Sequence, residues 1–241
     1  MRPGGAQGRA GLPCPQTAAA CAATGFGQSP PMLYMPPAFR ETDTDILHGL
    51  IRSARLAILI SPAPDEPLPW ITHLPLLLSP AEGPLGTLHG HVAKANPHWQ
   101  ALVRTGRALV IFPGPEAYVS PGHYASKREH GKVVPTWNYV AVHAECEAEV
   151  YQEPERLHAL VSRLTDHHEQ PRADPWAVTD APAPFIAGQL KGIVGLTLRI
   201  TALVGKRKLS QNRSPEDRAG VVAGLATSED ARDRDVAAVM E

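Results

Sequence analysis

The residues best able to do chemistry in this 241-residue chain lie in a polar run near its C-terminus. Lys206 to Arg213 reads KRKLSQNR, and it follows an apolar and polar alternation from Val194 to Val204, the period of a strand with one buried face. Ser214, Pro215 and Asp217 then predict a helix start with a cap, a first-position proline and the acid of a capping box. Basic and amide side chains beside bare helical N–H groups suit a bound anion.

A second candidate lies in residues 86 to 99, GTLHGHVAKANPHW. His89 and His91 share one face of a predicted strand, because residues two apart point the same way. A metal site would need this pair plus a third ligand such as His143 or one of residues 166 to 169. Histidines that pack beside a ligand or hydrogen-bond within a barrel are the simpler interpretation, so no metal is predicted.

Lys94 and Asn96 follow these histidines at the start of a predicted helix. A phosphate is physically plausible there, because helical N–H groups and an ammonium favour an anion. An exposed lysine beside a capping asparagine is the alternative interpretation.

The third candidate is PTWNY, which leads into a long predicted strand. Its aromatic side chains, Trp137 and Tyr139, could wall a flat ring, and the Asn138 amide could hydrogen-bond the edge of that ring. Core packing of the two aromatic side chains is the alternative. Upstream, residues 127 to 132 carry three cations in a loop, a pattern that is most often only solvated.

Five blocks of the sequence belong together: MPPAFRETD, THLPLLL, GTLHGHVAKANPHW, SKREHGKVVPTWNYVAVH and KLSQNRSPEDRAGVVAGL. In this order they resemble the PaiB-type family of FMN-binding negative transcriptional regulators, over about residues 32 to 225. The resemblance implies a mainly β (α+β) fold: an FMN-binding split β-barrel with peripheral helices, of the flavin-reductase and pyridoxamine-phosphate-oxidase type. It also implies a homodimer with FMN near the interface.

In the flavin split barrels the strand-to-helix segment holds the FMN phosphate, and the resemblance carries that role onto His91, Lys94 and Asn96. No catalytic residue is assigned. The complete predicted set of FMN-binding residues is His89, His91, Lys94, Asn96, Trp137, Asn138, Lys208, Gln211, Asn212 and Arg213.

Composition excludes several classes of protein. A formal net charge of −1 gives no global attraction to nucleic acid or to an anionic membrane surface. No apolar run approaches the roughly 20 residues that span a bilayer. The three cysteines, Cys14, Cys21 and Cys146, have no metal-type or redox spacing, which favours a reducing cytoplasm over a disulfide framework.

The ends of the chain differ from its middle. Residues 1–31 hold Gly, Ala or Pro at 18 positions and no acid, so we expect a disordered leader, with an over-extended gene start as its explanation. Residues 32–227 are expected to form the FMN-binding split-barrel domain, which reads as strands with a few inserted helices. Residues 228–241 are expected to be an acidic tail, frayed or partly helical.

Other catalytic motifs are missing from the sequence. There is no Gly-rich dinucleotide fingerprint, phosphate loop, nucleophile elbow or catalytic-thiol signature. No helix-turn-helix with a basic recognition helix is present, which weakens the case for direct DNA binding. Two functions therefore remain: a flavin-binding negative regulator of transcription, and a flavin-dependent oxidoreductase of the split-barrel flavin reductase type.

Overall fold

The computed structural model describes residues 33–241, so the predicted leader lies outside the described residues. Met35–Glu241 forms one compact unit. Its strands are β1 (Arg40–Glu41), β2 (Ala57–Ser61), β3 (Trp70–Leu74), β4 (Leu77–Ser79), β5 (Thr87–Ala93), β6 (Arg107–Val119), β7 (Thr136–Tyr151) and β8 (Ile193–Lys208). Its α-helices are α1 (Thr44–Ser53), α2 (His98–Thr105), α3 (Ser126–Glu129), α4 (Pro154–Glu169), α5 (Ala183–Leu190), α6 (Pro215–Ala226) and α7 (Ala231–Met240).

All the strands belong to one antiparallel sheet, in the order β3-β2-β6-β7-β8-β5-β4, with β1 paired to the far part of β8. β3 and β4 are consecutive in the chain but lie at opposite edges of this sheet, and β3 also contacts β5. Because only Pro75 and Leu76 separate the two edge strands, the sheet must curl until its edges meet. This arrangement confirms the prediction of a mainly β fold with helices.

Strict alternation along the strands builds the main core. On β7, Val142, Ala144 and Cys146 are buried, as the alternating pattern predicts. They pack with inward-facing residues of β2, β5, β6 and β8, including Leu59, Leu88, Val110, Leu196 and Leu198. The opposite side chains of β5, β7 and β8 point out of the barrel, where they are available for a site.

Two prolines place the strand boundaries differently from the prediction. In the sequence, Trp70 to Leu78 predicts a strand in which Pro75 indicates an edge or a bulge. The structure divides it at Pro75, which has no N–H to donate to a ladder, into the edge strands β3 and β4. In the sequence, the Pro113-Gly114-Pro115 segment predicts a turn between two strands, Arg107 to Phe112 and Ala117 to Val119. The structure instead has the single strand β6, and its register with β7 shifts between Pro113 and Glu116. This bulge accommodates the prolines, and Gly114 allows close approach, since a Cβ there would lie 2.9 Å from the Cβ of Val140.

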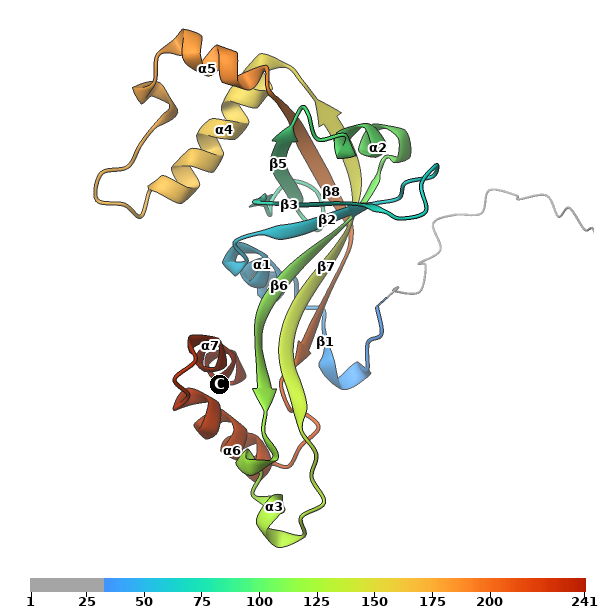
Figure 1. Ribbon diagram of the computed structural model, residues 1–241, viewed down its shortest axis with the longest axis vertical. Helices are drawn as coiled ribbons and strands as arrows, with labels where there is room; N and C mark the ends of the chain where they lie inside the picture. Colours follow the sequence, from blue (N-terminus) through green and yellow to red (C-terminus); the bar gives the residue numbers. More distant parts are fainter. Residues whose placement is uncertain (1–32) are drawn as a thin grey trace, which may run out of the picture. The chain divides into compact units, whose positions relative to one another are not determined.

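Figure 1 shows helices at both ends of the long strands β7 and β8, with α4 and α5 at one end and α6 and α7 at the other. Each pair has its own apolar cluster: Leu157, Leu160 and Leu190 with Tyr151 at the first end, and Val221 and Leu225 with α7 at the second. None of the helices between residues 33 and 241 combines the length and apolarity that a bilayer crossing needs.

The C-terminal residues, expected to be an acidic tail, frayed or partly helical, have the helical alternative in the structure. They form α7, which begins at the Asp230 cap, and its Val236, Ala237 and Met240 are buried against α6, β6 and β7. The acidic side chains of the segment dominate its composition, but a buried apolar stripe on the helix decides where it lies.

Candidate functional site

The ten predicted site residues fall into two groups at different ends of β8. His91 on β5 pairs with Gly195 near the beginning of β8, whereas Lys208 is the last residue of the same strand. β8 has 16 residues, which at about 3.3 Å each is roughly 50 Å of strand. Within one chain, the two groups cannot contact the same small ligand.

In the first group, His89 lies on the outer face of β5. Register places it beside Thr197 of β8, which in turn lies beside Glu149 of β7. The His89 Nε2 atom is 2.7 Å from the Glu82 carboxylate. These residues, with Tyr151, Arg156 and Arg199, line a polar hollow of about 260 Å³.

His91 belongs to the next row of the same face, with Gly195 and Tyr151. The Tyr151 ring lies directly over Gly195, where a Cβ would come within 2.3 Å of it. Burial lowers the pKa of His91, so the ring is neutral at neutral pH. Its Nδ1 atom is buried and has no hydrogen-bond partner within residues 33–241, which is costly for a polar atom unless a ligand or water satisfies it.

Lys94 follows β5, and its backbone is held on two sides. Its N–H donates to the Gly192 carbonyl at 2.8 Å, and its own carbonyl accepts from Trp99 Nε1 at 3.1 Å. The side chain is exposed, and the ammonium has no hydrogen-bond or ion-pair partner among the described residues. A cation is therefore presented on a fixed backbone at the start of α2.

Asn96 has its side chain turned inward. Its Oδ1 accepts from the His98 N–H at 3.0 Å, the capping contact that the sequence predicts, and its Nδ2 donates to Thr72 Oγ1 at 3.0 Å. Asn96 thus shapes the turn that carries Lys94, and only the second proton of its amide remains for a ligand.

The residue that joins these contacts is His98, which the sequence analysis missed. It is completely buried, and its ring nitrogens lie 2.8 Å from Thr72 Oγ1 and 2.9 Å from Ser61 Oγ. Burial lowers its pKa to about 4, so the ring is neutral. No spacing rule could have found it, because its partners lie 26 and 37 residues away in the sequence.

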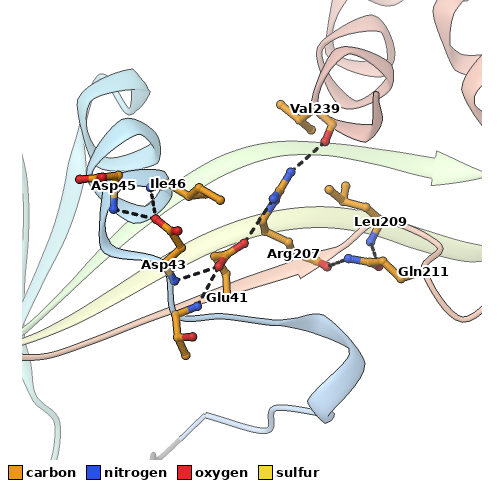
Figure 2. A network of polar contacts seen from close by, with 9 residues as sticks. Glu41, Asp43, Asp45, Ile46, Arg207, Leu209, Gln211 and Val239 are labelled. Carbon is orange, nitrogen blue, oxygen red and sulfur yellow. Dashed lines mark hydrogen bonds and ion pairs between the residues drawn. The ribbon is translucent and has the colours of Figure 1, made fainter.

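In the second group, the polar run that ends β8 is engaged in contacts within the chain. The Arg207 guanidinium lies between the Glu41 carboxylate at 3.3 Å and the Val239 carbonyl at 3.1 Å, and so joins β1, β8 and α7. Figure 2 shows this arrangement, with Gln211 folded back to accept from the Leu209 N–H and to donate to the Arg207 carbonyl.

Lys208 and Asn138 are also occupied. The Lys208 ammonium donates to Thr136 Oγ1 at 2.6 Å and to the Trp137 carbonyl, and burial together with nearby Lys206 and Arg213 lowers its pKa. Asn138 is completely buried and donates to Ser210 Oγ at 3.0 Å. Ser210 has a positive φ of 62°, a strained conformation that these contacts hold in place.

Three further residues complete this group. Trp137 is 55% exposed, and its ring lies edge-on to another exposed ring, Tyr118, with 5.8 Å between the centroids, so it is not a core residue. The Arg213 guanidinium lies over the Tyr124 ring at 4.7 Å. Asn212 is exposed, and its side chain makes no hydrogen bond to another residue of the described range 33–241.

The helix start that follows is capped differently from the prediction. Ser214 caps α6 as expected, with its Oγ accepting from the Asp217 N–H at 3.2 Å. The Asp217 carboxylate, however, does not return to the cap: it accepts from the Ser126 N–H at 2.9 Å and the Ser126 hydroxyl at 2.7 Å. Both contacts hold the pKa of Asp217 below its usual value and fasten the basic loop of residues 127 to 132 to α6.

The first group fits a phosphorylated, flat ligand better than the second. It offers an unused cation at Lys94, a buried ring nitrogen without a partner at His91 and a polar hollow lined by His89. Among residues 33–241, no group of three or more His, Cys, Asp or Glu side chains could hold a metal ion.

Comparison with known proteins shows the family. Residues 33–202 match the family model described as "Putative FMN-binding domain". The chain is 30% identical over 209 residues to the protease synthase and sporulation protein PAI 2 of Bacillus subtilis, covering 87% of this chain and 97% of that protein. It is also 34% identical over 236 residues to an uncharacterised protein of Aspergillus fumigatus, covering 80% of this chain and 90% of that one.

Solved structures support the fold. The flavocytochrome Anf3 of Azotobacter vinelandii has a TM-score of 0.52 at 13% identity, covering 75% of each chain. The FAD- and haem-binding protein of Mycobacterium smegmatis has a TM-score of 0.52 at 18% identity, covering 75% of this chain and 78% of that one. These neighbours confirm the split-barrel fold. The family model and the match to PAI 2 show that the chain belongs to the PaiB-type family of FMN-binding proteins.

Proposed function

We propose that the chain binds FMN on the outer face of β5 and at the start of α2. The observation that carries this proposal is the unpartnered Nδ1 of His91, buried beside a lysine whose ammonium is unused. Lys94 binds the phosphate as a point charge, and the positive end of the α2 dipole adds to the attraction. Asn96 shapes the turn, and His89 and His91 contact the remainder of the cofactor.

FMN supplies two-electron redox chemistry when bound, and the protein contributes binding, orientation and electrostatics. A neutral His91 suits this role, because a neutral ring can accept or donate one hydrogen bond without adding charge. The Glu82 carboxylate fixes the orientation of His89 in the same way that second-layer carboxylates orient other functional histidines.

We extend the proposal to a homodimer in which a second copy completes the flavin site. The hollow beside His89 measures about 260 Å³, below the roughly 300 to 1,000 Å³ typical of pockets for small-molecule ligands. The hollow of one chain is therefore smaller than a pocket that encloses such a ligand, which supports a contribution from a second copy. Light scattering on FMN-loaded protein should give about twice 25.9 kDa, and a monomer that retains FMN would contradict the shared site.

The biological role that we propose is negative regulation of transcription, as in the PaiB-type family. The match spans 97% of PAI 2, whose name refers to protease synthesis and sporulation. Because Arg207, Lys208 and Gln211 are occupied within the chain, we infer that regulation acts through a partner rather than through DNA contacts of this run. Binding of promoter DNA by the purified flavoprotein alone would contradict that route.

A second candidate function is a flavin-dependent oxidoreductase, and the polar hollow favours it. Arg156, Arg199 and Tyr151 surround a space that could admit a small polar substrate beside the flavin. The absorption spectrum distinguishes the two functions. Bands near ~450 nm report bound oxidised flavin, and their rapid loss on adding NADH would establish the enzyme, whereas a flavin that stays oxidised supports the regulator.

The Lys94→Ala variant tests the phosphate assignment. Removing the ammonium should weaken FMN binding about ten- to hundredfold, since a charge-assisted hydrogen bond contributes about 1.5–3 kcal/mol. Riboflavin, which lacks the phosphate, should bind the variant and the wild type equally, as measured by fluorescence titration. Lys132→Ala, another exposed lysine, is the matched control. Equal weakening of FMN and riboflavin by Lys94→Ala would show that Lys94 supports the fold or the ring pocket instead.

A further inference from the structure

His98 is the most completely satisfied buried polar residue near the proposed flavin site. It is wholly buried, yet both of its ring nitrogens have hydroxyl partners, one on β2 and one on β3. Its backbone N–H is also bonded, to the Asn96 side chain. A histidine in this position therefore connects the first turn of α2 to two strands of the barrel.

The direction of each hydrogen bond can be assigned. Asn96 Nδ2 can only donate, so Thr72 Oγ1 accepts from it and has its own proton left to give. The described residues offer that proton one acceptor, His98 Nδ1. His98 Nε2 then carries the ring proton and donates to Ser61 Oγ, which donates onward to the Pro62 carbonyl at 3.5 Å.

The resulting chain runs from Asn96 through Thr72 and His98 to Ser61, and each of its links joins one donor to one acceptor. Such a network specifies one geometry, because each member constrains the next and an unsatisfied buried member is costly. An apolar side chain could fill the volume of His98, but it could not fix the rotation of Thr72 or of the Asn96 amide.

The Lys94 backbone is anchored by two hydrogen bonds, from its N–H to the Gly192 carbonyl and from Trp99 Nε1 to its own carbonyl. The polar network anchors the other end of the same turn, at Asn96. The turn of residues 94 to 97 is therefore held at both ends, and only the lysine side chain extends freely from it. We infer that His98 is a positioning residue for the FMN phosphate: through Thr72 and Asn96 it fixes the turn that presents Lys94. This inference rests on the proposed function.

The test is the preference for FMN over riboflavin, because a purely structural role would change both affinities alike. His98→Gln keeps a donor toward Ser61 and loses the acceptor that faces Thr72. It should lower the ratio of the FMN and riboflavin affinities about five- to tenfold and leave riboflavin binding within about twofold of the wild type.

Thr72→Val provides a second variant of nearly unchanged shape that breaks the same link, and Thr72→Ser restores the hydroxyl. We expect Thr72→Val to lower the FMN preference as His98→Gln does, and Thr72→Ser to recover it. If His98→Gln does not fold, the two Thr72 variants decide the question.

The outcomes separate this inference from the proposed function. If Lys94→Ala lowers the FMN preference but Thr72→Val does not, the phosphate site stands and the positioning role of His98 is wrong. If Lys94→Ala leaves the preference unchanged, both are overturned. Equal weakening of FMN and riboflavin by Thr72→Val assigns the network to the fold alone.

Discussion

The turn between β5 and α2 resembles the run that ends β8 in the types of its polar residues. The two segments differ in whether those side chains are bonded within the chain. Each brings lysine and asparagine side chains to the start of a helix. In the first, the Lys94 ammonium and the His91 Nδ1 have no partner among the described residues. In the second, Arg207, Lys208 and Gln211 bond to the chain itself (Figure 2). The difference lies in the two lysines, because the Lys94 ammonium is unused and the Lys208 ammonium is engaged within the chain.

The two helices that follow these segments also differ in the charge of their first turns. α6 has a serine cap and two carboxylates, Glu216 and Asp217, in its first turn, so the positive end of its dipole is already compensated. α2 has no acid in its first turn. An incoming phosphate would meet repulsion at α6 and attraction at α2.

The largest effect that tests this comparison should come from removing α7. Deleting residues 229–241 would expose the cluster that Val236 and Met240 complete and would leave Arg207 and Arg218 without their carbonyl acceptors. We expect a loss of about 5 kcal/mol or failure to fold, from the apolar burial alone. Urea denaturation measures it, with the exposed Asp235→Ala as control. An equally stable truncated protein would show that the C-terminal joint is dispensable.

Arg207→Ala should destabilise the protein by about 3 kcal/mol. Its partner Glu41 is only 18% exposed at the side chain and would be left without its cation. Arg199→Ala is the matched control, because its pair with Glu147 is exposed, with side chains 61% and 56% accessible, and should cost less than about 1 kcal/mol. If the two variants lose similar amounts of unfolding free energy, the Arg207–Glu41 pair is no more important to stability than the exposed Arg199–Glu147 pair.

Mild acid should weaken the polar network at α2. Burial lowers the pKa of His98 to about 4, so the unfolded chain, with a histidine pKa near 6.5, takes up the proton first. Stability is therefore complete above pH 6.5 and is lost as the pH falls toward 4, by about 2 kcal/mol at pH 5. The residues in contact with the ring, Ser61, Thr72 and Trp70, do not ionise in this range.

Burial lowers the pKa values of His91 and His143 as well, which adds to the acid effect in the same direction. Urea titrations at pH 7 and pH 5 measure the total loss of unfolding free energy. The His98→Gln variant isolates the contribution of His98, because its stability should depend less steeply on pH. If the unfolding free energy of that variant depends on pH as steeply as that of the wild type, a neutral His98 ring is not the source of the acid sensitivity.

The smallest expected effect is that of Lys208→Ala on flavin binding. Its ammonium is already bonded to Thr136 and to the Trp137 carbonyl, so the ratio of FMN and riboflavin affinities should stay within twofold of the wild type. Fluorescence titration beside Lys94→Ala makes the comparison direct. A tenfold loss of FMN preference would instead mean that the end of β8 reaches the phosphate of a second copy.

The local part of this description was predictable. The alternation along β7 and β8, the Ser214 cap and the capping contact of Asn96 are set by neighbours within a few residues, so their patterns are visible in the sequence. The family resemblance extended the prediction to the split barrel and to FMN, because its five blocks lie on the strands and turns of the barrel and on parts of α2, α3 and α6.

The remaining features depend on contacts between distant residues. Sequence alone determined which segments are strands, where helices start and which residues carry charge. It did not determine that Asp217 turns to Ser126, 91 residues away, that Arg207 meets Glu41, 166 residues away, or that His98 joins two strands. Only the tertiary structure decided which lysine remains unused, because whether a polar group is free depends on partners that the curled sheet brings to it.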